Sequence, residues 1–176
     1  MEDLARALQE AHPELEAVRE AAREPVYLVG GAVRDLLLGR PRADVDLVVE
    51  GDAAALAQRL GGAAVEHERF GTVKVEVEGH EIDIAGAREE SYPEPGALPV
   101  VRPAESVEQD LARRDFTINA IALPLQGELR PVDPFEGMAD LGRGLLRVLH
   151  DRTFLDDPTR AIRAARYASR FGFPLE

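Results

Sequence analysis

The sequence contains no cysteine, only one lysine, Lys74, and only one asparagine, Asn119. The absence of cysteine excludes disulfides and thiolate metal sites, so any metal ion must be bound by carboxylates or histidines. Carboxylates predominate, and hard oxygen ligands favour Mg²⁺ or Mn²⁺. Arginine far outnumbers lysine, a bias that GC-rich coding and growth at high temperature would both produce.

Signals for secretion and membrane insertion are also missing. The first residues, Met1-Glu2-Asp3, show neither the basic region nor the apolar region of a signal peptide. The apolar runs are too short to span a bilayer, so we expect a soluble cytoplasmic protein. The net charge of −12 argues against strong non-specific binding of nucleic acid by the segment as a whole. Contact with RNA then requires a local basic patch or parts of the protein outside this sequence.

The hydrophobic pattern predicts a mixed sheet with flanking helices, an α+β or α/β fold. Its 176 residues, 45% of them hydrophobic, suit one domain with an appendage. Helices are predicted at 2–23 with an interruption near Pro13, and at 32–38, 52–60 and 158–171. Strands are predicted at 26–29 and 44–49, with hairpins formed by 72–77 and 81–85 and by 120–125 and 129–132. Residues 89–104 contain four prolines and are predicted to form a loop. The chain stops soon after the last helix without a terminal signal, which suggests a fragment of a longer polypeptide.

The first candidate for chemistry is the pair Asp44 and Asp46 at the start of a strand. Residues i and i+2 of a strand point to the same face, about 6.6 Å apart. Two carboxylates so placed can share metal ions about 4 Å apart. A bare Asp-x-Asp is more often a solvated strand end, but here three apolar residues follow, which indicates a buried strand. Asp83, in the predicted strand 81–85, is a candidate third carboxylate, although an ordinary amphipathic strand explains it equally well.

A second candidate is Gly30-Gly31 with Arg34, between a predicted strand and a predicted helix. Glycines allow backbone N–H groups to approach phosphate oxygens, and the start of a helix favours anions. Arg34 would add a charged donor. The spacings of a Walker loop and of a dinucleotide fingerprint are absent. A Gly-Gly turn alone is more often structural, but only one helix separates it from the strand that carries Asp44.

Two further segments combine arginine with acidic residues. In the first, Arg114 and Asp115 are followed by Asn119, a set that could bind phosphate and sugar hydroxyls or form a surface salt bridge. In the second, Asp157 and Arg160 are three residues apart at the start of a predicted helix and therefore share a face. A carboxylate beside a guanidinium can bind the Watson–Crick edge of a base, although a helix cap with an ion pair is the commoner explanation. Arg163, Arg166 and Arg170 continue a basic stripe that could meet phosphates or balance the acidic surface, and Arg163 is our candidate for nucleotide binding.

Together, four segments resemble the tRNA nucleotidyltransferase and poly(A) polymerase family in its bacterial and eukaryotic class. They are LVGGAVRDLLLG with DVDLVV, RRDFTINAIAL, DPFEGMADLGRGLLRVL, and FLDDPTRAIRAARYASRFGF, in this order between residues 26 and 173. One such motif is weak evidence, whereas four in order are highly specific.

The resemblance implies a nucleotidyltransferase head of the polymerase-β type. It implies a helical segment at 1–24, the head at 25–150 and the start of a helical neck at 151–176, with the body and tail that grip tRNA absent. It assigns two Mg²⁺ ions to Asp44 and Asp46, and Asp83 stands where relatives often have a carboxylate. It assigns the triphosphate to Gly30, Gly31 and Arg34, the ribose to Arg114, Asp115 and Asn119, and base selection without a template to Asp157 and Arg160.

The implied reaction is attack of an RNA 3′-hydroxyl on the α-phosphorus of CTP or ATP. We expect CCA-end synthesis or repair on tRNA, with poly(A) synthesis as the alternative. CCA, CC-only, A-only and poly(A) addition share these motifs. The loop that contains residues 89–99 is expected to influence the choice among them, although its effect cannot be read from one sequence. The oligomeric state cannot be predicted from the sequence. A catalytically silent nucleotide-binding module, or a structural piece that serves the absent body, is a further alternative that the intact pair Asp44 and Asp46 argues against.

Overall fold

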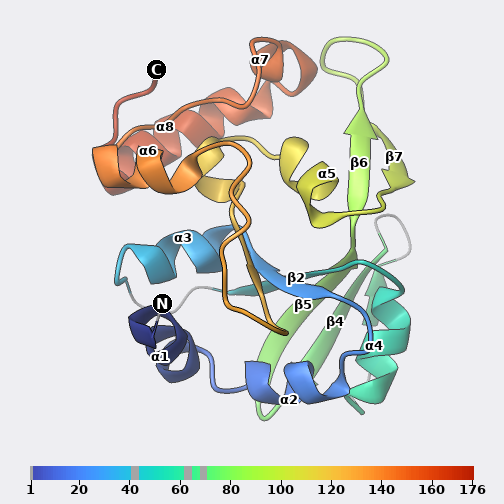
Figure 1. The fold of residues 1–176 in the computed structure, drawn as a ribbon. Helices are drawn as coiled ribbons and strands as arrows, with labels where there is room; N and C mark the ends of the chain where they lie inside the picture. Colours follow the sequence, from blue (N-terminus) through green and yellow to red (C-terminus); the bar gives the residue numbers. More distant parts are fainter. Residues whose placement is uncertain (1, 41–43, 62–64, 68–70) are drawn as a thin grey trace.

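The computed structural model describes residues 2–40, 44–61, 65–67 and 71–176 (Figure 1). Its helices are α1 (Glu2–Ala11), α2 (Leu15–Ala21), α3 (Gly31–Leu37), α4 (Ala53–Arg59), α5 (Val107–Ala112), the 3₁₀ helix η1 (Thr117–Asn119), α6 (Gly137–Arg143), α7 (Thr153–Asp156) and α8 (Thr159–Phe171). Its strands are β1 (Val26–Val29), β2 (Val45–Val49), β3 (Val65–His67), β4 (Thr72–Val77), β5 (His80–Gly86), β6 (Arg88–Ser91), β7 (Val100–Pro103) and β8 (Ala122–Pro124). None of the helices described is long and apolar enough to cross a membrane.

Six strands form one sheet in the order β3-β4-β5-β2-β1-β8. β2 runs parallel to β5, and all other neighbours in this sheet are antiparallel. The predicted mixed sheet with flanking helices is therefore confirmed, as is the hairpin formed by β4 and β5. The register of the parallel pair places Asp46 directly beside Asp83.

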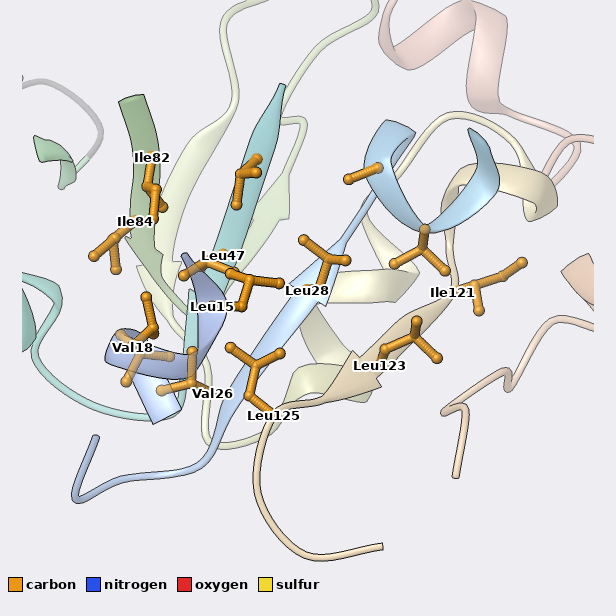
Figure 2. Packing of buried hydrophobic residues seen from close by; sticks show 14 of the residues in the cluster. Leu15, Val18, Val26, Leu28, Leu47, Ile82, Ile84, Ile121, Leu123 and Leu125 are labelled. Atoms are coloured by element: carbon orange, nitrogen blue, oxygen red, sulfur yellow. The ribbon is translucent and has the colours of Figure 1, made fainter. Parts of the chain in front are cut away.

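Alternation along β2 gives the two faces of the sheet different roles. Val45, Leu47 and Val49 belong to a large buried cluster that also contains side chains of α2, α3 and α4. Figure 2 shows part of this cluster, including Leu47 together with Leu15 of the α2 helix. Burying each large aliphatic side chain contributes about 1.5–3 kcal/mol to folding. Because successive side chains point to opposite faces, Asp46 lies on the other side of the sheet. That side holds a second cluster, which includes Val48 of β2 and side chains of α5.

Side-chain caps begin two of the predicted helices. Asp52 Oδ1 accepts hydrogen bonds from the backbone N–H groups of Ala54 and Ala55 at 2.8 and 3.2 Å, at the start of α4. Asp157 Oδ1 accepts one from the N–H of Thr159 at 2.9 Å, at the start of α8. Each such cap contributes about 1 kcal/mol. The predicted starts of both helices are thus confirmed, and each carboxylate satisfies N–H groups that lack a partner within its helix.

Residues 89–104 do not form the loop that their prolines predicted. β6 and β7 pair antiparallel as a separate two-stranded ribbon, which rises beside α5 in Figure 1. Pro93, Pro95 and Pro99 lie in the connection between the strands, and Pro103 is the last residue of β7. Proline is tolerated at the end or outer edge of a strand, where its missing N–H removes no necessary bond.

The predicted hairpin of residues 120–125 and 129–132 is wrong in part. β8 pairs with β1, and the second segment meets β8 only through an isolated bridge between Ala122 and Val132. Gln126, in the expected turn, instead binds the chain at β1: its side chain accepts from the N–H of Val26 and donates to the carbonyl of Glu24, both at 3.0 Å. Long-range pairing has replaced the local hairpin.

Three short helices were not predicted, namely α5, α6 and α7, which have six, seven and four residues. Helical periodicity needs about three turns to be recognised in a sequence, and none of the three reaches that length. The equally short α3 and α4 were predicted from the signals at their ends, a glycine turn before α3 and the capping Asp52 before α4. The division into a segment at 1–24, a head at 25–150 and a neck from 151 stays a prediction.

Candidate functional site

A cavity of about 940 Å³ brings together most of the residues singled out from the sequence. Its lining includes Gly30, Gly31, Arg34, Asp44, Asp46, Arg114, Asp115, Asn119, Asp157, Arg160 and Arg163. These residues come from α3, β2, η1, α8 and the segments next to them, so the fold collects positions that are up to 133 residues apart, from Gly30 to Arg163. Asp83 is the one predicted site residue that does not line this cavity.

The carboxylate of Asp46 lies beside the turn between β1 and α3. A Cβ atom placed on Gly30 would lie 3.8 Å from Asp46 Oδ2 and 3.1 Å from Arg114 Nη1. Asp46 is solvent-exposed within the cavity, yet desolvation by the surrounding walls raises its pKa above the ordinary value. Arg114 opposes this rise, and the negative charges of Asp83 and Asp44 add to it.

Asp83 is close to the pair but faces a different partner. It is the neighbour of Asp46 in the parallel register, so the two side chains share a face. Lys74 Nζ of β4 lies 3.1 Å from Asp83 Oδ1 and also pairs with Glu81. The amphipathic strand that the sequence suggested as an alternative is therefore present, and its charges pair with a lysine.

The acidic residues next to β2 suit a hard divalent cation. No group of three or more His, Asp or Glu side chains in the described part of the chain is already arranged to hold a metal. The donors at this point are nevertheless all carboxylates, the ligands that Mg²⁺ prefers. Desolvation and then the negative charges of Asp83 and Asp44 raise the pKa of Asp46, and a bound cation would offset both effects. The residues present therefore fit such an ion.

The Gly30-Gly31 turn places backbone N–H groups and an arginine at one point. Gly30 has φ = +69°, a conformation that residues with a side chain rarely adopt. Arg34 is buried: its Nε donates to Asp35 Oδ1 at 2.9 Å and its Nη1 donates to Asn119 Oδ1 at 2.7 Å. The third nitrogen, Nη2, lies 3.4 Å from where a Cβ on Gly31 would be. This nitrogen is the part of Arg34 that faces the turn.

A buried carboxylate fixes the two adjacent arginines. Asp110 of α5 is fully buried, and its Oδ1 accepts from Arg113 Nη2 while its Oδ2 accepts from Arg114 Nη2, both at 2.8 Å. Burial alone would raise the pKa of Asp110, but the charges of Arg114 and Arg113 outweigh burial and hold that pKa below its ordinary value. The surface salt bridge considered for this segment is therefore a largely enclosed cluster.

Asp115 and Asn119 form one hydrogen-bonded unit with α8. Asp115 Oδ1 accepts from Asn119 Nδ2 at 2.8 Å, and its Oδ2 accepts from Arg163 Nε at 2.7 Å. Since Asn119 also accepts from Arg34, a continuous chain of hydrogen bonds runs from α3 through η1 to α8. Arg163 thus belongs to the site and is not only part of a surface stripe.

Asp157 and Arg160 face each other at the start of α8, with Arg160 Nε 3.7 Å from Asp157 Oδ2. Arg160 is buried: its Nη1 donates to Thr153 Oγ1 at 2.6 Å and its Nη2 donates to the carbonyl of Arg113 at 2.7 Å. The guanidinium is therefore held in one orientation beside the carboxylate of Asp157.

Sequence reasoning missed four residues at this site. Glu90 and Tyr92 of the unpredicted ribbon line the cavity, as does Tyr167 of α8. Asp110 supports the cavity from α5. The spacing of Asp110 to Arg113 and Arg114, three and four residues on, is a signal that could have identified it. Glu90 and Tyr92 belong to the segment 89–99 that was expected to influence which nucleotides are added, but no local signal placed these two residues in the cavity.

Comparison with known proteins supports the same assignment. The family model described as "Poly A polymerase head domain" matches residues 26–147. An A-adding tRNA nucleotidyltransferase of Halalkalibacterium halodurans is 50% identical over 163 residues, which cover 88% of this chain and 38% of that protein. A CC-adding tRNA nucleotidyltransferase of Deinococcus radiodurans is 43% identical over 150 residues, covering 81% of this chain and 40% of that protein.

A solved structure of a CCA-adding enzyme in an apo form superposes on this chain with a TM-score of 0.89 at 41% sequence identity. The superposed region covers 98% of this chain and 44% of the CCA-adding enzyme. This agrees with the nucleotidyltransferase head that the sequence implied. This chain therefore spans less than half the length of these relatives. Nucleotidyltransferases generally use divalent metals. On the family match and the fold, the chain belongs to the poly A polymerase head domain family.

Proposed function

We propose that this chain is the catalytic head of a template-independent RNA nucleotidyltransferase that acts on the 3′ end of tRNA in the cytoplasm. It adds CMP, AMP or both, from CTP and ATP. The observation that carries the proposal is the position of Asp46, beside the Gly30 turn and Arg114 in one cavity. A metal-binding carboxylate, a phosphate-binding turn and a cation are the parts that phosphoryl transfer requires.

We assign Asp44 and Asp46 to the binding of two Mg²⁺ ions, with Asp83 as a candidate third carboxylate. When bound, these ions lower the pKa of the attacking hydroxyl and neutralise the charge that develops on the leaving group. Desolvation and the negative charges of Asp83 and Asp44 raise the pKa of Asp46, which supports this assignment because both disfavour the ionised carboxylate without a cation.

The chain's own residues hold the nucleotide for an in-line displacement. The N–H groups of the Gly30-Gly31 turn and Arg34 Nη2 receive the triphosphate, and Arg114 Nη1 lies beside Gly30. The 3′-oxygen of RNA forms a bond to the α-phosphorus while the bond to the bridging oxygen breaks, and pyrophosphate leaves. Asp115 and Asn119 bind the ribose hydroxyls. Most of the catalysis in such a site is positioning and electrostatic stabilisation.

Asp157 and Arg160 select the base. Cytosine and adenine each present an amino donor beside a ring-nitrogen acceptor on the Watson–Crick edge, whereas guanine and uracil present a carbonyl beside a ring N–H. A carboxylate acceptor beside a guanidinium donor complements only the first pattern. Because Thr153 and Arg113 hold the guanidinium of Arg160, the pair is rigid enough to discriminate.

The names of the relatives favour tRNA over poly(A) synthesis, but they include both A-adding and CC-adding enzymes. The head therefore leaves open which of these additions the whole protein performs. The ribbon of β6 and β7 is a candidate for this choice, since Tyr92 and Glu90 line the cavity near Arg160.

The test is extension of a tRNA that lacks its 3′ end, with CTP or ATP and Mg²⁺, resolved on a denaturing gel. Nucleotide binding is measured in parallel by calorimetry. Asp46→Ala should abolish extension, and Glu76→Ala, an exposed acid on β4, serves as the control. Failure of the wild type to bind either nucleotide contradicts the proposal. Repeated AMP addition to any RNA would support poly(A) synthesis, and nucleotide binding without extension would support a silent module.

A further inference from the structure

Helix α8 places two aromatic rings against the arginine that faces the phosphate-binding turn. The guanidinium carbon of Arg34 lies 5.3 Å from the ring centre of Tyr167 and 4.7 Å from that of Phe171. These two rings, here called the aromatic shelf, stack on each other with centres 5.9 Å apart and an angle of 25°. Neither ring has a place in the reaction proposed above.

The charge of Arg34 needs the shelf because the side chain is only 4% exposed. A buried guanidinium is costly unless neighbours replace its lost hydration. The carboxylate of Asp35 does so only in part, since its second oxygen accepts from Arg170 at 2.9 Å. Ring faces carry negative potential and attract a cation most strongly where water is excluded.

The shelf also fixes which nitrogen of Arg34 is presented to a ligand. Asp35 and Asn119 hold Nε and Nη1 by hydrogen bonds, while the rings of Tyr167 and Phe171 pack against the guanidinium. Under these restraints Nη2 lies beside Gly31. A fixed donor binds a phosphate more tightly than a mobile donor does, because the side chain loses less conformational entropy on binding.

Tyr167 itself is held by the core of the molecule. Its ring meets the edge of Phe116, a fully buried residue, with centres 5.7 Å apart at 87°. Its hydroxyl accepts from Arg163 Nη2 at 3.0 Å, and its ring centre lies 5.4 Å from the guanidinium carbon of Arg166. With Arg34, the same residue contacts three of the arginines that line the cavity.

We infer that Tyr167 and Phe171 are positioning residues that act through Arg34 to bind the triphosphate. The inference rests on the proposed function, because it assigns a purpose to Arg34 Nη2 in the same site. The shelf lies on α8 while the glycine turn lies on α3, so affinity for the triphosphate depends on the seating of α8.

The test compares the affinity of the chain for ATP and for adenosine, both measured by calorimetry with Mg²⁺. Tyr167→Leu removes the ring and should weaken ATP binding about 10-fold, with adenosine affinity unchanged. Tyr167→Phe keeps the ring and should retain most of the ATP affinity. Phe171→Leu, at the half-buried end of the helix, should give a smaller loss in the same direction. Ile162 lies on the same helix and is 74% exposed, so Ile162→Ala is the matched control and should change neither affinity.

A double-mutant cycle separates positioning from a structural role. If the shelf acts through Arg34, Tyr167→Leu should cause little further loss of ATP affinity in an Arg34→Ala background. Equal losses in both backgrounds, or equal losses of ATP and adenosine, would overturn the inference. Should Tyr167→Leu fail to fold, Phe171→Leu with the same cycle decides the question. A wild type that binds neither ligand would instead refute the proposed function, and the inference with it.

Discussion

Asp110 and Arg114 form an ion pair of 2.8 Å in which the carboxylate is completely enclosed. With Arg113 on its other oxygen, the pKa of Asp110 lies below the ordinary value of 3.8. A carboxyl group whose pKa is lower in the folded than in the unfolded chain stabilises the fold above its unfolded pKa. That stability is lost as the pH falls through the folded pKa.

Asp110→Asn should therefore lower the free energy of unfolding by about 3 kcal/mol at neutral pH, because two arginines lose their buried partner. The difference from the wild type should shrink as the pH is lowered below about 4. Urea titrations at pH 7 and at stepwise lower pH measure this, with Glu108→Gln on the exposed side of α5 as control. A difference that stays constant over that range would contradict the assignment.

Gly30→Ala should destroy nucleotide binding at a modest cost in stability. With φ = +69° and ψ = −132°, Gly30 lies in a sparsely populated region that strains an alanine by about 1–3 kcal/mol, and the new Cβ would lie 3.1 Å from Arg114 Nη1. Gly39 has φ = +60°, but a Cβ there meets nothing within 4 Å. Gly39→Ala is thus the control, with a positive φ but no crowding. If both variants bind ATP equally well, the turn is not the phosphate site.

The negative charge of Asp46 should destabilise the folded chain when no divalent cation is present. Asp46→Asn removes a charge that desolvation and the neighbouring charges of Asp83 and Asp44 disfavour, so we expect the melting temperature in EDTA to rise slightly. Added Mg²⁺ should stabilise the wild type and leave the variant unchanged, while RNA extension is lost in the variant. Scanning calorimetry with EDTA and with MgCl₂ checks this. An Asn variant that melts at a lower temperature than the wild type in EDTA would show that the charge of Asp46 does not destabilise the fold.

Asp157 has two roles that two substitutions can separate. Asp157→Ala removes both the cap of α8 and the acceptor for the base, and should cost about 1 kcal/mol of stability. Asp157→Asn keeps an oxygen for the N–H of Thr159 but replaces the second oxygen with a donor. Both variants should lose the preference for CTP and ATP over GTP and UTP in calorimetric titrations. An Asn variant with unchanged preference would place base selection elsewhere. Arg160→Ala is the less informative change, since Arg160 also holds Thr153 and the Arg113 carbonyl.

Much of the sheet and the centre of the site could be predicted from local patterns. Strands β1, β2, β4 and β5 have strong apolar alternation or runs, and Asp52 and Asp157 cap their helices where expected. The pair Asp44 and Asp46 was identifiable because three apolar residues fix β2 as a buried strand. These features depend on neighbours within a few residues, which a single sequence displays directly.

The remainder depends on contacts across the chain. The ribbon of β6 and β7 is held by pairing between residues 88–91 and 100–103, which outweighs the prolines between them. Gln126 joins β1 across 100 residues of sequence, so no local turn signal could reveal its role. Tyr167 looks like an ordinary core residue of an amphipathic helix, and only the fold shows that its ring lies against Arg34.

The lining of the cavity contains seven arginines and six acidic residues, which are Asp35, Asp44, Asp46, Glu90, Asp115 and Asp157. Because positive and negative side chains are nearly equal in number, the net charge of the lining is small, and we expect the cavity to attract anions only weakly. Free sulfate, phosphate or RNA backbone gains little by entering without a cation, and bulk salt should compete only weakly with a correctly shaped nucleotide. Pyrophosphate, once cut from its nucleoside, keeps only the contacts of the glycine turn and its arginines. If the proposed function holds, we therefore expect the near-neutral lining to retain pyrophosphate only weakly.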